Sequence, residues 1–203
     1  MRVEILTRSP TPGRVKTRLI PALGAERAAA LHAAMVHETL RRVAAAGLEA
    51  RVHLDGDLED PFARGLMDLG AALVPQASGD LGDRILAALS GPGRALVLGT
   101  DCVAFEPAWL QRAAASPAPV VIGPAEDGGY WTLAVERAQP ELFQGVPWST
   151  DGVLAATMQA AGRLGLKVET LPTCYDIDTP ADLDRLRRDP ACPPSLWPAL
   201  GRS

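Results

Sequence analysis

Apolar and polar positions alternate along the chain in a way that predicts strands and helices following one another. Short apolar runs, typical of buried strands, are separated by longer stretches with helical spacing. The pattern predicts strands at 2–6, 49–54, 72–74, 95–98, 120–122, 130–135 and 168–171. It predicts helices at 24–46, 60–69, 82–90, 107–115, 150–164 and 180–188.

This order of elements favours an α/β fold. Strands that alternate with helices form a mainly parallel sheet with helices on both faces. No helix separates 120–122 from 130–135, so we expect the second of these strands to run antiparallel and the sheet to be mixed. The length of 203 residues suits one domain. We expect a three-layer α/β/α domain over residues 1–189 and an irregular, proline-rich tail over 190–203.

Composition narrows the classes of function. The net charge of -4 argues against a dedicated nucleic-acid binder, which would carry a basic excess. No apolar run approaches the ~20 residues of a membrane span, and the first residues do not resemble a signal peptide. We therefore expect a cytoplasmic protein with no membrane or nucleic-acid partner. The 3 cysteines form no CxxC pair, and the 3 histidines lack metal-binding spacing, so no disulfide framework or thiolate zinc site is expected.

The loop after the first strand, TRSPTPGRVKTRL at 7–19, is unusually basic. Its four cations would repel one another unless an anion lay among them, and Gly13 lets backbone N–H groups face a ligand. The loop is not a Walker A motif, because Val15 stands where a glycine should precede the lysine. The loop favours polyphosphate binding over a merely solvated basic segment. Its cations are Arg8, Arg14, Lys16 and Arg18.

Two aspartates are candidate metal ligands. Asp101 follows the most apolar strand, and Mg²⁺ favours one or two carboxylates together with substrate phosphates. In the segment 175–182, helix capping accounts for TPAD but not for Asp176 or Asp178. We take Asp178 as the second ligand and expect Mg²⁺ or Mn²⁺ as the cofactor.

Three further loops have two interpretations each. The loop QASGDLGDR at 76–84 either caps a helix or closes over a nucleotide. EDGGY at 126–130 is a turn signal that can also form an acceptor wall, with Asp127 as a base. Ser149 and Thr150 can cap the next helix or contact an acceptor. The nucleotide candidates here are Gln76, Gly79 and Asp80, and the acceptor candidates are Gly128, Gly129, Tyr130, Trp148, Ser149 and Thr150.

The ordered motifs PTPGRVKTRL, GDLGDR, GTDC, GPAEDGGY, PWST and DIDTPADL span residues 2–187 with their surroundings. With them the chain resembles the GT-A-type transferases of radical-SAM and selenium-related gene neighbourhoods. More distantly it is similar to 2-phospholactate and molybdenum-cofactor guanylyltransferases. The resemblance implies a nucleotide-diphospho-sugar transferase fold whose basic loop holds donor phosphates and whose two aspartates hold metal. One departure is Val103, where the family usually has proline.

These features predict a metal-dependent transferase that uses a nucleotide-activated donor. In the favoured reaction, a phosphate or hydroxyl of a small acceptor attacks a nucleoside triphosphate and releases pyrophosphate. Lys16, Asp101 and Asp127 are the candidate catalytic residues. Glycosyl transfer from a nucleotide sugar is the alternative, although the single aspartate at 101 departs from the usual Asp-x-Asp motif. The third hypothesis is a nucleotide-binding module without catalytic activity. The base, the acceptor and the oligomeric state stay open.

Overall fold

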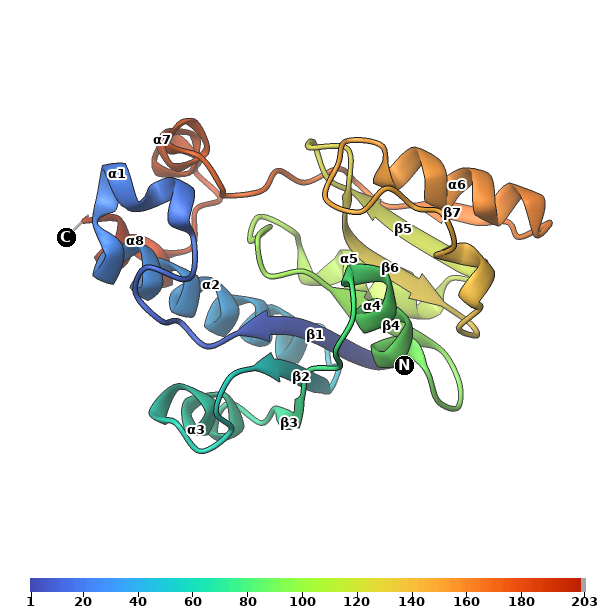
Figure 1. The fold of residues 1–203 in the computed structure, drawn as a ribbon, viewed down its shortest axis with the longest axis horizontal. Helices are drawn as coiled ribbons and strands as arrows, with labels where there is room; N and C mark the ends of the chain where they lie inside the picture. Colours follow the sequence, from blue (N-terminus) through green and yellow to red (C-terminus); the bar gives the residue numbers. More distant parts are fainter. Residues whose placement is uncertain (202–203) are drawn as a thin grey trace.

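A seven-stranded mixed sheet runs through the centre of the protein (Figure 1). The structure is a computed structural model that describes residues 1–201. The strand order is β3-β2-β1-β4-β6-β5-β7, and β6 runs antiparallel to both of its neighbours, as the sequence predicted. The strands are β1 (Arg2–Arg8), β2 (Ala50–Asp55), β3 (Ala72–Pro75), β4 (Ala95–Leu98), β5 (Val120–Pro124), β6 (Tyr130–Val135) and β7 (Val168–Thr170).

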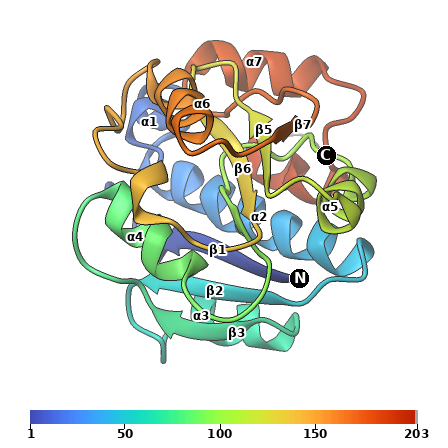
Figure 2. The ribbon, with the colours of Figure 1, turned by 90° about the vertical axis from the view of Figure 1, so that its right-hand side faces the viewer.

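Helices cover both faces of the sheet, which confirms the expected α/β fold (Figure 2). Side chains alternate between the two faces along β4. Leu96 and Leu98 pack in the cluster with α2, α3 and α5, whereas Ala95 and Val97 pack in the cluster with α4 and α6. The helices are α1 (Ile20–Leu23), α2 (Ala25–Ala45), α3 (Pro61–Asp68), α4 (Leu81–Leu89), α5 (Pro107–Ala115), α6 (Val153–Arg163), α7 (Pro180–Arg188) and α8 (Trp197–Leu200). Single 3-10 turns are η1 (Thr17–Leu19), η2 (Pro140–Leu142) and η3 (Pro194–Leu196).

Local chemistry sets where the helices begin. At the start of α7 the Thr179 side chain accepts the Asp182 N–H, and the Asp182 carboxylate reaches back, completing a capping box. The helix expected at 150–164 instead begins at Val153. Ser149 has a left-handed φ of 63°, and the Thr150 hydroxyl accepts the Gly152 N–H at 3.2 Å, so this stretch forms a turn.

The segment after residue 189 differs from the irregular tail that its prolines suggested. It forms η3 and α8, which pack against α2 and the neighbouring loops. Leu196 and Leu200 are buried there, and the Ser195 hydroxyl donates a hydrogen bond of 2.8 Å to Glu38. The apolar side chains between the prolines therefore override the helix-breaking composition. None of the helices described for residues 1–201 is both long and apolar enough to cross a bilayer.

The loops that carry the candidate site residues lie at the carboxyl ends of the strands, which we call this edge of the sheet. All strands except β6 point the same way, so the loops after β1, β3, β4, β5 and β7 emerge together. The neighbours β1 and β4 continue toward opposite halves of the sheet, which makes this edge a topological switch point, the usual place for a ligand. The segment after β7 crosses the same edge, where the Ile177 N–H donates to the Asp101 carbonyl at 3.0 Å (Figure 1).

Candidate functional site

Two adjoining pockets open at this edge of the sheet. We call the first the arginine pocket; it has a volume of about 370 Å³ and lies over β1 and its loop. The second, the aspartate pocket, has a volume of about 490 Å³ and lies over β4, β6 and the turns beyond them. The two share Arg18, Asp101 and Asp178, so a ligand in one pocket would touch the wall of the other.

Lys16 forms the centre of the shared wall. Its ammonium donates to Asp101 Oδ1 at 2.6 Å, to Asp178 Oδ1 at 2.8 Å and to the Ile177 carbonyl at 2.7 Å. These bonds use all three N–H groups of the lysine, whose side chain is only 3% exposed. The backbone supports this placement, because Lys16 adopts a left-handed φ of 46° just before η1. The sequence placed Lys16 among donor phosphates, whereas here its ammonium holds the two aspartates together.

The ion pairs set the charge state of this wall. Burial alone would lower the pKa of Lys16, but the carboxylates of Asp101 and Asp178 raise it above its ordinary value. Burial likewise opposes ionisation of Asp101, yet the ammonium holds the pKa of Asp101 below its usual range. Both groups are therefore charged at neutral pH.

The arginine pocket is strongly cationic. Its basic side chains come from the first loop and from α4, and its acidic groups are Asp101 and Asp178. Arg84 is held in place by bonds of 3.0 Å to both Gln76 Oε1 and the Gly79 carbonyl. Five cations in one pocket suit a polyanion such as a polyphosphate. They are Arg8, Arg14, Lys16, Arg18 and Arg84.

His32, like Arg84, lines the arginine pocket but was not a candidate site residue in the sequence. It lies on α2, and its Nε2 is 3.3 Å from Thr7 Oγ1 and 3.1 Å from the Arg8 carbonyl. Burial lowers its pKa from the ordinary 6.5. The imidazole therefore braces the end of β1 as a neutral ring.

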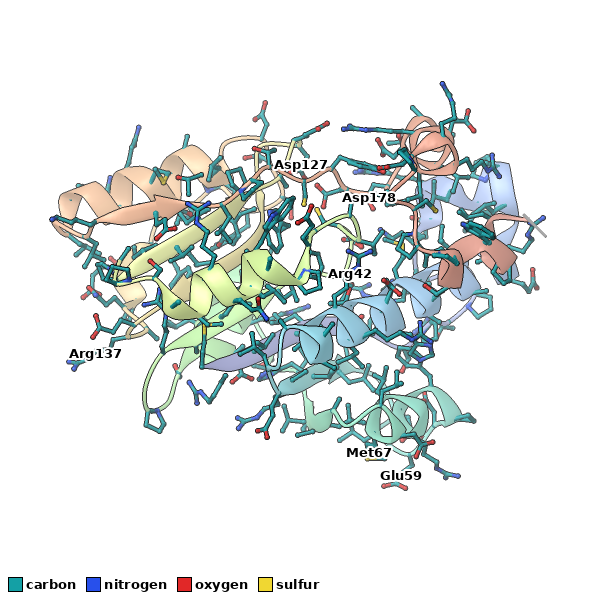
Figure 3. All side chains as sticks on the ribbon, turned by 180° about the vertical axis from the view of Figure 1, so that it is seen from behind. Arg42, Glu59, Met67, Asp127, Arg137 and Asp178 are labelled. Carbon is teal, nitrogen blue, oxygen red and sulfur yellow. The ribbon has the colours of Figure 1, made fainter. Side chains whose placement is uncertain are left out.

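Two turns that contact each other, at 126–129 and 149–152, line the aspartate pocket. Gly128 has a φ of 88°, and a Cβ there would lie 2.2 Å from the Asp151 carbonyl oxygen. Its own carbonyl accepts the Leu154 N–H at 2.9 Å. Asp127 accepts the Gly129 N–H at 2.9 Å, which fixes the tip of the first turn. Figure 3 shows Asp127 and Asp178 on neighbouring loops at this edge, far from Arg137 and Glu59.

Aromatic side chains line the same pocket. Trp148 stacks on Phe143 with ring centroids 6.3 Å apart and lies against the first turn of α4, where a Cβ on Gly82 would meet its indole at 2.5 Å. Tyr130 and Trp131 complete this side of the pocket. The pocket thus offers aromatic surface and carboxyl groups within one volume.

Asp176 is the most perturbed acid of the aspartate pocket. Burial first, and then the neighbouring carboxylates of Asp127, Asp101 and Asp178, raise its pKa to about 7. The Cys102 thiol donates to Asp176 Oδ1 at 3.3 Å, whereas Oδ2 is buried with no hydrogen-bond partner among the described residues. Sequence reasoning noticed that capping does not explain Asp176 but gave it no role.

The structure brings most of the sequence-predicted residues into the two pockets. Gly13, Gly79, Asp80 and Gly128 do not line either one. Asp80 instead caps α4 through a capping box with Asp83, the structural alternative that its sequence allowed. Those that line the pockets are Arg8, Arg14, Lys16, Arg18, Gln76, Asp101, Asp127, Gly129, Tyr130, Trp148, Ser149, Thr150 and Asp178.

The aspartates of the shared wall meet the needs of a divalent cation in part. Asp101 and Asp178 converge on one cation, Lys16, while their side chains stay 48% and 41% exposed to the pockets. Within residues 1–201 no group of three or more His, Cys, Asp or Glu is arranged to hold a metal by itself. Two carboxylates fit Mg²⁺ that completes its shell with water and substrate phosphate.

The fold is similar to the folds of several solved transferase structures. A protein of Desulfovibrio desulfuricans G20, assigned as a nucleotide-diphospho-sugar transferase, is 27% identical with a TM-score of 0.83, covering 94% of this chain and 91% of its own. The inositol-1-phosphate CTP transferase of T. maritima is 15% identical with a TM-score of 0.62, covering 99% and 95%. CMP:2-keto-3-deoxy-manno-octonic acid synthetase complexed with CTP is 14% identical with a TM-score of 0.57, covering 91% and 95%.

Sequence comparison gives the family. No curated protein matches the chain. One family profile matches residues 39–150, more than half of the chain, from the middle of α2 to the second turn of the aspartate pocket. The chain therefore belongs to the family described as "Uncharacterized protein conserved in bacteria (DUF2064)".

Proposed function

We propose that this protein is a metal-dependent transferase that moves a nucleotidyl group from a nucleoside triphosphate to a small acceptor. One observation carries the proposal: four arginine side chains line a single pocket whose inner wall holds two aspartates paired with Lys16. A triphosphate carries more negative charge than the diphosphate of a nucleotide sugar, so this pocket favours the triphosphate. The motif resemblance to guanylyltransferases and the likeness to a CTP transferase fold agree with this choice.

Each group has a role in the proposed reaction. An acceptor oxygen attacks the α-phosphorus, a new P–O bond forms, and the bond to the bridging oxygen breaks to release pyrophosphate. Arg8, Arg14, Arg18 and Arg84 orient the triphosphate and neutralise charge on the leaving pyrophosphate. Asp127 accepts the proton of an acceptor hydroxyl from the aspartate pocket.

The shared wall has a positioning role. Asp101 and Asp178 would hold Mg²⁺ or Mn²⁺, which when bound supplies charge neutralisation at the phosphate oxygens. Lys16 keeps these two carboxylates at a fixed separation, as its bonds of 2.6 and 2.8 Å indicate. The positive charges of Lys16 and Arg18 together offset the two negative charges of the carboxylates. Lys16 acts through the aspartates, so we assign it as a positioning residue instead of a phosphate ligand.

A thermal-shift screen tests the proposal. Nucleoside triphosphates and nucleotide sugars are added separately, each with and without Mg²⁺. A ligand at 100 times its dissociation constant adds about 2.7 kcal/mol to the free energy of unfolding. We expect a metal-dependent shift with a triphosphate. A shift only with nucleotide sugars would favour glycosyl transfer, the second candidate, which the likeness to the Desulfovibrio protein supports. No shift with either class contradicts a nucleotide-dependent function.

A further inference from the structure

Carboxyl groups outnumber cations in the aspartate pocket. Lys16 and Arg18 lie beside Asp101 and Asp178, at 2.6 to 4.0 Å. No ion pair recorded among residues 1–201 holds the other three acids of the pocket, which are Asp127, Asp151 and Asp176. A phosphate group entering here would meet uncompensated negative charge, in contrast to one entering the arginine pocket.

Asp176 lines the pocket and has one carboxyl oxygen unpaired among the residues that the structure describes, which bears on the chemistry of a ligand. Asp176 Oδ2 is buried without a hydrogen-bond partner in the described part of the chain, although Oδ1 of the same carboxyl accepts from Cys102. Buried acceptors are costly to leave unpaired. A hydroxyl group can pair with this carboxyl in either protonation state, because it both donates and accepts, whereas an ionised phosphate can only accept and is repelled by the ionised carboxylate.

The aromatic surface supplies the third observation. Trp148 and Tyr130 line the same pocket as the aspartates and are only partly buried. Trp148 is held by its stacking on Phe143 and its close contact with Gly82, so its ring is a fixed wall. Aromatic faces pack against the C–H surface of a ligand, while carboxylates accept hydrogen bonds from its hydroxyl groups.

We infer that the acceptor is a polyol or amino-polyol that carries no phosphate. The inference rests on the proposed function, because it names the molecule that receives the transferred group. It replaces the phosphate nucleophile that the sequence left open with a hydroxyl, whose proton passes to Asp127. Charge separates the two substrates: the arginine pocket takes the polyanion, and the aspartate pocket takes a neutral or cationic partner.

Isothermal titration with matched pairs of small molecules tests this inference. The protein is titrated with glucose, ribose and inositol, with their monophosphate esters, and with glucosamine. Each titration is repeated with Mg²⁺ and the triphosphate that gives the largest thermal shift. We expect each free polyol to bind at least about tenfold more tightly than its phosphate ester, since the phosphate would lie among carboxylates that no cation of residues 1–201 offsets. We expect glucosamine to bind at least as tightly as glucose.

Two variants locate the effect. Asp127→Asn combined with Asp151→Asn removes two charges but keeps an acceptor oxygen for the Gly129 N–H, so the preference should shrink at least about threefold. The matched control, Asp68→Asn combined with Asp184→Asn, removes the same charge from exposed helix positions and should keep the preference.

The outcomes separate the two proposals. Equal or tighter binding of the phosphate esters, no binding of any free polyol, or an unchanged preference in the pocket variant overturns the inference. Selective polyol binding without any nucleotide shift supports the inference about the pocket and rejects the nucleotide donor. A nucleotide shift together with a preference for phosphate esters retains the donor and rejects the acceptor class.

Discussion

The arginine pocket and the aspartate pocket share a wall but present opposite charge. The cations of the first come mostly from one loop, residues 8–18, with Arg84 added from α4. The acids of the second come from four separate segments, at 101, 127, 151 and 176–178. A site built from one loop is visible as a cluster in the sequence. A site assembled from several strand ends becomes visible only when the sheet order is known.

Asp101→Asn is the strongest way to break this arrangement, because Asp101 belongs to both pockets. Metal-dependent turnover should fall by roughly 10³-fold, as expected when several kcal/mol of charge stabilisation are lost. Pyrophosphate release with the triphosphate from the screen measures it. Glu106→Gln is the control, since Glu106 is exposed on the same loop and makes no side-chain cap. Full turnover in Asp101→Asn would remove Asp101 from the metal site.

Arg14→Ala tests the arginine pocket alone. Loss of one charged hydrogen bond should weaken triphosphate binding by about 1.5–3 kcal/mol, with little change in the binding of an uncharged polyol. Titration calorimetry of both ligands measures the contrast. Arg137→Ala serves as the control, because Arg137 lies at the far end of the molecule (Figure 3). Equal weakening in both variants would mean that the effect is one of net charge only.

Gly128→Ala tests the aspartate pocket alone. Its new Cβ would lie 2.2 Å from the Asp151 carbonyl oxygen, so the two turns must separate. Polyol binding should weaken while triphosphate binding is retained, and the free energy of unfolding should fall by about 1–3 kcal/mol. Gly165→Ala carries a similar φ of 68° but meets no atom within 4 Å, so it isolates the backbone cost. Identical losses of polyol binding in both variants would contradict this role for the two turns.

The smallest expected effect concerns pH and His32. Its pKa is lowered in the folded protein, so below pH 6.5 the unfolded chain binds more protons at this position. The free energy of unfolding should therefore decrease as the pH falls from 6.5 toward the pKa of His32 in the folded protein. Above pH 6.5 His32 should cause no change. Urea unfolding of wild type and His32→Gln across pH 5–8 measures this. A variant with the same slope below pH 6.5 would assign the loss to other groups.

Much of the fold follows from local patterns in the sequence. Apolar runs predicted β4 and β6 with their observed bounds, and the missing helix before β6 predicted its antiparallel direction. The packed segment at Leu196–Leu200 was hidden because its burial depends on α2, about 160 residues earlier in the chain. Local propensity carries no signal for such a contact.

The site was predictable to the extent that its chemistry is local. The cations of the first loop and Asp101 stood out from their neighbours in the sequence. The bonds from Lys16 to Asp101 and Asp178 join positions 85 and 162 residues apart, so their geometry required the folded sheet. Asp151 was missed, and Asp176 was noticed but given no role, because the two turns and the segment after β7 meet only in the folded chain.

The apolar cluster that contains Leu19, Val103 and Ile177 predicts how a C-terminal truncation would affect the site. Leu19, Val103 and Ile177 lie within three residues of Lys16, Asp101 and Asp178, and all three belong to the cluster that also contains Leu196 and Leu200. A truncation at residue 190 would keep every side chain that lines the two pockets. It would nevertheless strip apolar contacts from the common anchor of three site loops. The last helical turn therefore acts as a remote brace, through which substitutions can tune how rigidly the site is held.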